Sequence, residues 1–329
     1  MQETVILTGA AGFIGSHTAK SLLDQGYKVI GIDNMNDYYD VTLKEARLAP
    51  LLKNQHFTFY KEGIENKEAI EAIFKKHQEA AYVVHLAAQA GVRYSLTNPF
   101  AYIESNLMGH TVMMESSRQL KGLKHFVYAS SSSVYGANTK IPFSIEDQVD
   151  EPLSLYAATK KSCEMIAHSY ANVYKMPSTG LRFFTVYGPF GRPDMAAFIF
   201  ADCIVKEKPI PLFNHGNMKR DFTYIDDIVS GIIAAMLRPA VANDKGIPHK
   251  VYNLGNHKSE NLKDFVAILE AEFGRKAIIN PLPMQVGDVP QTYADIAESQ
   301  KDLGFSPKTP IAIGLKNFAS WYKNYYKIN

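Results

Sequence analysis

The chain has 329 residues, of which 46% are hydrophobic, 21% charged and 12% aromatic. These fractions are typical of a globular protein and exclude a disordered or fibrous one. Its 35 basic and 33 acidic residues give a net charge of +2, which lacks the basic excess of a dedicated nucleic-acid-binding protein. At this length, one or two domains bury a large core without disulfides.

The chain shows no sign of a metal site, a leader or a membrane anchor. Its two cysteines, Cys163 and Cys203, are too few for a disulfide framework or a thiolate metal site. The N-terminal stretch has neither a basic region nor a cleavage signature. The longest apolar run, residues 228–237, is shorter than the roughly 18 residues of a spanning helix. We therefore expect a cytoplasmic protein that acts on a small molecule, without nucleic-acid, membrane or metal partners.

The first 185 residues alternate short apolar strands with amphipathic helices. The expected strands are residues 4–8, 28–33, 56–60, 82–86, 125–129 and 179–183, and the expected helices are residues 14–25, 43–52, 67–76, 102–120 and 155–174. Strands that are apolar throughout and alternate with helices predict a parallel sheet covered on both faces. This is the Rossmann-type, doubly wound α/β fold.

Proline and glycine become frequent after residue 188. A strand at 250–254, a helix at 262–273, a turn-rich loop at 281–290 and a terminal helix at 311–325 follow. They predict a smaller C-terminal lobe over the carboxyl edge of the sheet, where doubly wound sheets bind ligands. We expect residues 1–185 with about 225–256 to form the nucleotide-binding domain, and about 186–224 with 257–329 to form the substrate-binding lobe.

A glycine-rich turn, with Gly9, Gly12 and Gly15, joins the first strand to the first helix. Such a turn lets backbone N–H groups approach a pyrophosphate at the positive end of the helix. Asp33 ends the second strand, where a carboxylate accepts the adenosine ribose hydroxyls and repels a 2′-phosphate. The pattern favours NAD over NADP; a purely structural turn before a strand-end aspartate is the alternative.

Tyr156 and Lys160 lie one turn apart on one face of an expected helix. A phenol has a reference pKa of about 10, and a neighbouring ammonium favours its phenolate, which makes it a usable base. Ser131 belongs to a run of four serines at the end of the fifth strand, where a hydroxyl is placed to bond a substrate oxygen. Taken singly, these features also fit a solvated helix face and a polar loop.

Together, these residues resemble the extended short-chain dehydrogenase/reductase family along the whole chain. The matching segments are residues 8–15, 33–34, 85–93, 130–136, 156–160, 181–189 and 220–227. Within that family, residues 91–95, 191–196 and 285–289 are similar to those of UDP-glucuronate 4-epimerases. The resemblance implies NAD-dependent epimerisation of UDP-glucuronate to UDP-galacturonate through a transient 4-keto sugar. It also implies a homodimer joined by helices 102–120 and 155–174.

The resemblance implies a role for each matching residue. Tyr156 is the base, Lys160 its electrostatic partner and a ribose ligand, and Ser131 assists at the sugar O4. The implied cofactor-binding residues are Gly9, Gly12, Phe13, Ile14, Gly15, Asp33, Asn34, Ile64, Leu86, Ala87, Ala88, Asn106, Tyr156 and Lys160. The implied substrate-binding residues are Gln89, Arg93, Ser131, Ser132, Ser133, Tyr156, Thr185, Arg192, Phe213, Arg220 and Asp288.

Three of these roles have simpler explanations. Arg220 matches a pyrophosphate-binding arginine, although a surface ion pair explains it as well. Phe213 matches a residue that stacks on uracil, although a core aromatic is the plainer explanation. Arg192 is a candidate partner for the sugar carboxylate, a loop anchor, or an arginine that faces solvent. Asp288 matches the ligand of the uridine ribose.

Two positions distinguish this chain from its relatives. Related decarboxylases carry a glutamate in the serine motif where this chain has Ser133, which favours an epimerase over a decarboxylase. A neutral UDP-hexose 4-epimerase and a non-catalytic NAD-sensing scaffold are two further candidates for the function.

Gly63 stands where the family usually has an aspartate that contacts the adenine, so we expect backbone atoms or Glu62 to make that contact instead.

Overall fold

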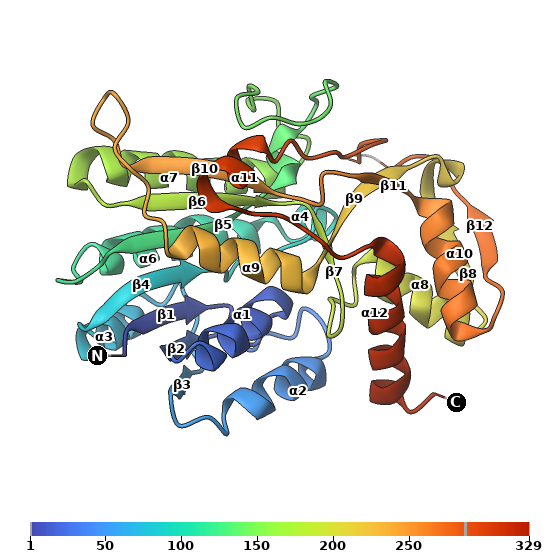
Figure 1. Cartoon of the computed structure of the whole chain (residues 1–329), viewed down its shortest axis with the longest axis horizontal. Coiled ribbons are helices and arrows are strands. Elements are labelled where there is room, and N and C mark those ends of the chain that lie inside the picture. Colours follow the sequence, from blue (N-terminus) through green and yellow to red (C-terminus); the bar gives the residue numbers. More distant parts are fainter. Residues whose placement is uncertain (1, 286–287, 329) are drawn as a thin grey trace.

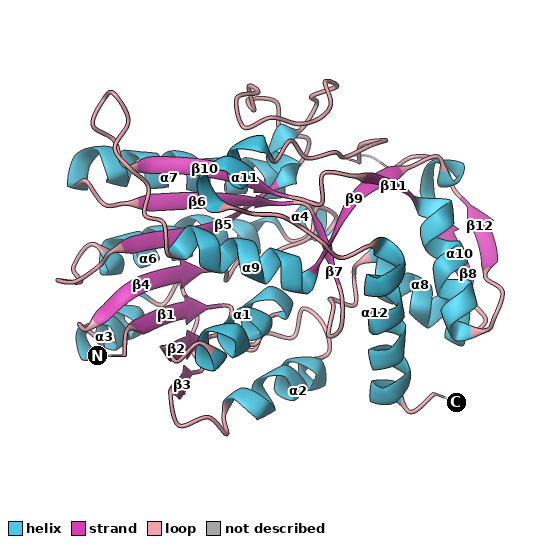
Figure 2. Ribbon diagram, viewed as in Figure 1, coloured by secondary structure: helices cyan, strands magenta, loops and turns pink. Residues whose placement is uncertain are grey.

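The computed structural model describes residues 2–285 and 288–328. Val286 and Gly287, which belong to the expected 285–289 motif, lie outside the described residues. The main sheet consists of β1 (Thr4–Thr8), β2 (Lys28–Ile32), β3 (Phe57–Tyr60), β4 (Ala80–His85), β5 (His125–Ser131), β6 (Ser178–Phe183) and β10 (His249–Leu254). Its order is β10-β6-β5-β4-β1-β2-β3, with parallel pairing throughout (Figures 1 and 2). The Rossmann-type sheet predicted from the apolar strands is confirmed.

Helices cover both faces of this sheet, as the apolar strands require. Val5 and Leu7 of β1 pack on one side, with α1 (Phe13–Asp24), α2 (Val41–Leu51) and α9 (Ile225–Met236). Ile6 points to the other side, with α3 (Lys67–Lys76), α6 (Gly109–Ser117) and α7 (Leu155–Tyr174). Successive strand side chains alternate between faces, so both sets must be apolar when both faces are covered.

The smaller lobe lies beside the carboxyl edge of the sheet, to the right in Figure 1. Its helices are α8 (Ala196–Val205), α10 (Leu262–Phe273) and α12 (Ile311–Tyr326), and α11 (Ala297–Leu303) lies near β10. One small sheet has the order β11 (Ser259–Asn261), β9 (Lys219–Tyr224) and β7 (Thr185–Tyr187), and β8 (Pro209–Leu212) pairs with β12 (Ile278–Pro281). The sequence did not indicate these short strands, because they carry little alternation of apolar and polar residues.

The helix expected over residues 102–120 is present, but its bounds and winding differ. After the short helix α4 (Tyr94–Thr97), helical residues run without a break through α5 (Pro99–Tyr102), the π-helix η1 (Ile103–Met108) and α6. The wider π turn contains Asn106, whose buried side chain bonds residues of two other segments instead of facing solvent. π turns of this kind are frequent at functional sites. In the part of the chain that the structure describes, no helix combines the length and apolarity that crossing a membrane requires.

Candidate active site

A cleft of about 660 Å³ opens where the carboxyl ends of the main strands face the smaller lobe. This volume is within the range of small-molecule sites. The cleft is lined by all of the catalytic, cofactor-binding and substrate-binding residues expected from the sequence except Asn106. Residues from positions 9 to 288 therefore meet in one cavity, at the edge where doubly wound sheets bind ligands.

The glycine turn forms a narrow cradle at the end of β1. Gly9 has a φ of +71°, and a Cβ there would lie 2.9 Å from the backbone nitrogen of Ala87. A Cβ at Gly15 would overlap the carbonyl oxygen of Gly9. Asp33 accepts hydrogen bonds from the backbone N–H groups of Ala11 at 3.0 Å and Met35 at 2.9 Å. Space kept free by glycine next to a fixed carboxylate fits the pyrophosphate and ribose of a dinucleotide.

Tyr156 and Lys160 enter the cleft from the first turns of α7. Ser154 caps this helix by accepting a hydrogen bond from the Ala157 N–H at 3.1 Å. Lys160 is only 4% exposed and lines the cleft. Ser131 comes from the end of β5, where its Oγ accepts from the Ser133 N–H at 3.1 Å. The tyrosine, the lysine and the serine thus line the same cleft from two elements.

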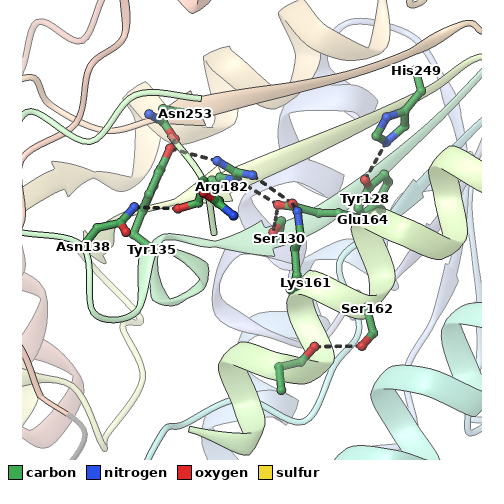
Figure 3. Close-up of polar contacts among 12 residues, drawn as sticks. Tyr128, Ser130, Tyr135, Asn138, Lys161, Ser162, Glu164, Arg182, His249 and Asn253 are labelled. Carbon is green, nitrogen blue, oxygen red and sulfur yellow. Dashed lines mark hydrogen bonds and ion pairs between the residues drawn. The ribbon is translucent and has the colours of Figure 1, made fainter. Parts of the chain in front are cut away.

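A buried polar network fixes the strands behind these groups (Figure 3). Ser130 donates to Glu164 at 2.7 Å, and Arg182 donates to both Glu164 oxygens at 2.8 and 2.9 Å. Arg182 also donates to the Tyr135 hydroxyl, which donates to Asn253 at 2.6 Å. Burial by itself would raise the pKa of Glu164, but the Arg182 guanidinium outweighs burial and holds that pKa below its ordinary value. The network ties β5, β6 and β10 to α7 and so sets the spacing of the groups in the cleft.

Asn106 lies behind the cleft wall and not in it. It is 2% exposed, accepts from the Gln89 N–H at 2.8 Å and donates to the Gln89 carbonyl at 3.0 Å. It also donates to the Thr159 hydroxyl at 3.0 Å. Asn106 therefore joins the segment after β4 to α7. His85, also behind the wall, shares a hydrogen bond with Thr8 at 2.8 Å, which gives it a structural role.

The residues expected at the uridine end, Arg220, Phe213 and Asp288, all line the cleft and belong to two contacting pairs. Arg220 donates to Asp288 at 2.6 Å, with 14% of the arginine side chain exposed. The ion pair foreseen as an alternative for Arg220 exists, but it lies in the cleft wall and not on the outer surface. The guanidinium of Arg93 stacks over the ring of Phe213, 4.8 Å from its centroid. An aromatic face and two arginines therefore converge at this end.

Arg192 extends into the cleft from the loop after β7, where it is held by Asp194 at 3.0 and 2.5 Å. Although burial opposes it, the Asp194 charge raises the pKa of Arg192, and Tyr156 is near enough to add to the effect. Thr185, at the start of β7, lines the same cavity. A fixed guanidinium and several hydroxyls therefore line the same cleft as Tyr156 and Lys160.

Gly63 is not required by the backbone of this chain. A Cβ at residue 63 would overlap only the carboxylate of Glu65, which is the far end of a flexible side chain that can move aside. Glu62 lines the cleft, as expected of a residue that replaces the usual contact.

The family described as the NAD dependent epimerase/dehydratase family matches residues 5–255. The chain belongs to this family. It is 51% identical to Protein CapI of Staphylococcus aureus, over 98% of this chain and 99% of that one. It is 46% identical to the probable UDP-glucuronate 4-epimerase of Rhizobium meliloti (strain 1021), over 98% of this chain and 97% of that one.

A solved structure of this epimerase/dehydratase family shows the same fold. The UDP-glucuronic acid 4-epimerase from Bacillus cereus, in complex with UDP-glucuronic acid and NAD, is 36% identical to this chain. It superimposes with a TM-score of 0.89, covering 98% of this chain and 100% of that one.

Some residues of this epimerase/dehydratase site could not be foreseen from the sequence. Tyr38 and Asp194 line the cleft and bond each other across 156 positions of sequence. Arg47 is 3% exposed, and its guanidinium donates a hydrogen bond to the Phe190 carbonyl, in the loop that precedes Arg192. Two features of the sequence pointed to these residues. Arg47 is a charged residue among the apolar positions of the second helix, and Asp194 belongs to the 191–196 motif.

Proposed function

We propose that this protein is a UDP-glucuronate 4-epimerase that converts UDP-glucuronate to UDP-galacturonate with bound NAD. One observation carries the proposal: Tyr156, Lys160 and Ser131 share a cleft with the glycine cradle and with the Arg192 guanidinium. The relatives named as UDP-glucuronate 4-epimerases, one of them in a complex with UDP-glucuronic acid and NAD, support it.

The residues present fit NAD. Gly9, Gly12 and Gly15 leave room for the pyrophosphate, and Asp33 is held by backbone N–H groups beside the expected adenosine ribose. We propose that Asn106 acts on this site through Gln89 and α7 and not by direct contact, because it is buried behind the wall. The chemistry that NAD supplies when bound is acceptance of a hydride from the sugar C4 and its return.

Tyr156 takes the proton from the sugar O4 and later gives it back. Lys160 lies one helical turn after Tyr156 and lines the same cleft, so its positive charge is available to the oxygen through which Tyr156 exchanges the proton. The Ser131 hydroxyl hydrogen-bonds the same oxygen, first as a hydroxyl and then as the carbonyl of the 4-keto sugar. Inversion requires the 4-keto sugar to turn its other face to the cofactor before the hydride returns.

The uridine end must stay fixed while the sugar turns. Arg220 offers a guanidinium to the diphosphate, Phe213 a ring to the uracil and Asp288 a carboxylate to the uridine ribose. The hydroxyl groups of Ser131 and Ser132, offered to the sugar ring itself, can bond several orientations of a sugar. Firm binding at one end and looser binding at the other permit the rotation.

The sugar carboxylate needs a fixed place during oxidation. A 4-keto uronate is a β-keto acid, which loses CO₂ when its carboxylate stands perpendicular to the carbonyl plane. We propose that Arg192 and Thr185, together with Ser132 and Ser133, hold the carboxylate away from that orientation. The absence of a glutamate at residue 133 supports epimerisation over decarboxylation.

We further propose the domain division and a homodimer. Residues 1–185 with about 225–256 would bind NAD, and about 186–224 with 257–329 would bind the UDP-sugar. Large apolar side chains are exposed on α5, η1 and α7: Phe100 at 80%, Met108 at 48%, Met165 at 63% and Val173 at 62%. Apolar side chains gathered on neighbouring helices favour association with a second copy.

Proton NMR of purified protein with UDP-glucuronate, without added NAD, tests the proposed function. We expect the anomeric signals of UDP-galacturonate and no pentose. UDP-xylose or a 4-keto pentose would instead identify a decarboxylase. A protein that ignores UDP-glucuronate but interconverts UDP-glucose and UDP-galactose would be a neutral hexose epimerase, and no turnover of any of these sugars would favour a non-catalytic scaffold.

A further inference from the structure

The loop that carries Arg192 is fastened to the nucleotide-binding part of the protein. Arg47 of α2 donates to the Phe190 carbonyl at 3.1 and 2.7 Å and to the Gly191 carbonyl at 3.2 Å. Its remaining terminal nitrogen donates to the carbonyl of Ala11, in the glycine turn, at 3.3 Å. The backbone on which Arg192 stands is therefore held against the glycine turn.

A second connection fixes the Arg192 side chain itself. Asp194 accepts from Arg192 with both oxygens, and one of these oxygens also accepts from the Tyr38 hydroxyl at 3.0 Å. Tyr38 follows Asp33 by five residues, so it comes from the loop expected to bind the cofactor ribose. Its ring packs on Tyr94, with centroids 4.8 Å apart. Tyr38 and Asp194 thus orient a guanidinium that belongs to another segment.

Burial keeps Tyr38 protonated, and neighbouring charges keep Asp194 ionised. Burial, and then the Asp194 charge, raise the pKa of Tyr38 to about 12, so its hydroxyl stays a donor at physiological pH. Although burial opposes it, Arg192 and the Tyr38 hydroxyl hold the pKa of Asp194 below its ordinary value. The bonds to Asp194 use Nε and Nη2 of Arg192, and its Nη1 makes no hydrogen bond with the residues that the structure describes.

We propose that Tyr38 and Asp194 are positioning residues that aim the Arg192 guanidinium at a sugar carboxylate and so set the preference for UDP-uronates over neutral UDP-hexoses. The proposal rests on the proposed function and extends it to residues that do not themselves reach the sugar. A guanidinium held on one edge presents its other edge in a fixed direction, which favours a carboxylate over a hydroxymethyl group.

Calorimetric titration tests this proposal with Tyr38→Phe and Asp194→Asn, each in a Tyr156→Phe background that stops turnover. The ligands are UDP-glucuronate, UDP-glucose and UDP, and the last two lack the sugar carboxylate. We expect each variant to bind UDP-glucuronate roughly tenfold more weakly, as for the loss of one charge-assisted contact, with UDP and UDP-glucose unchanged. Tyr170→Phe is the matched control, because the hydroxyl of Tyr170 donates to Glu115 and this residue does not line the cleft.

Product analysis adds a second measurement, with Tyr156 intact. A loosely held carboxylate should release CO₂ more often, so Tyr38→Phe should raise the pentose fraction of the product. The proposal is overturned if the affinity for UDP-glucuronate is unchanged, if all three ligands lose affinity equally, or if Asp194→Asn binds UDP-glucuronate more tightly. If the unmodified protein does not epimerise UDP-glucuronate, the proposed function itself fails, which is a distinct outcome.

Discussion

At the scale of the residue, Tyr156 and Lys160 lie one helical turn apart and line the same cleft. Their spacing puts an ammonium beside a phenol, and the burial of Lys160 keeps water from screening that charge. This pair could be predicted from the sequence because both members lie in one helix. The Tyr38–Asp194 bond could not, because the fold alone joins positions that distant.

Tyr156→Phe removes the proposed base and keeps the ring. We expect turnover of UDP-glucuronate to fall at least about 100-fold, since general-base catalysis contributes about that much. UDP binding should stay as it is, because UDP lacks the sugar on which Tyr156 acts. Tyr170→Phe is the control, because this tyrosine of the same helix bonds Glu115 instead of lining the cleft. Undiminished turnover in Tyr156→Phe would remove Tyr156 from the base role.

At the scale of the element, α7 connects the proposed catalytic groups, Tyr156 and Lys160, to the sheet. Glu164, one turn after Lys160, binds Arg182 of β6 and Ser130 of β5. The sequence predicted α7 from its helical spacing of apolar residues and the strands from their apolar runs. It gave no indication of the ion pair between Glu164 and Arg182. It also missed the π turn in η1, because no local pattern marks it and the bonds that its Asn106 makes are to residues distant in the sequence.

Glu164→Gln tests the contribution of this connection. The substitution leaves Arg182 buried without its counter-charge, and we expect the free energy of unfolding to fall by about 3–5 kcal/mol. Urea unfolding followed by circular dichroism measures it. Lys20→Ala is the comparison, because it breaks the exposed pair with Asp24 and should change stability little. Equal losses in the two variants would contradict a structural role for the buried pair.

At the scale of the whole molecule, the exposed apolar side chains of α5, η1 and α7 predict association. Met165 and Val173 are eight residues apart and so share a face of α7. The double variant Met165→Lys with Val173→Lys should sediment as a monomer, because lysines on a joined apolar face would be desolvated. The unmodified protein should sediment as a dimer in sedimentation velocity at micromolar concentration. A monomer at that concentration would refute the homodimer.

Buried histidines predict how the stability of the whole molecule depends on pH. Burial lowers the pKa of His110 to about 3 and of His125 and His249 to about 4, and holds that of His85 well below 6.5. Burial raises the pKa of Asp221 to about 6, so the folded chain binds one proton there that the unfolded chain does not. Near pH 5 the unfolded chain then binds about three more protons than the folded one. The free energy of unfolding should therefore drop by about 4 kcal/mol per pH unit as the pH falls.

Urea unfolding between pH 7.5 and 4.5 measures this slope. His110→Phe keeps an aromatic ring among Phe126 and Tyr128 but cannot titrate, so its slope should be lower by about one proton. A stability that stays constant down to pH 5 would contradict the burial of neutral histidines.

The central claim is inversion at C4 by a hydride that leaves and returns within one active site. UDP-glucuronate deuterated at C4 tests it most directly, with the purified protein in ordinary water and no added NAD. We predict UDP-galacturonate that keeps its deuterium at C4, because the hydride never exchanges with solvent. UDP-galacturonate with hydrogen from water at C4, or no UDP-galacturonate at all, would contradict the account.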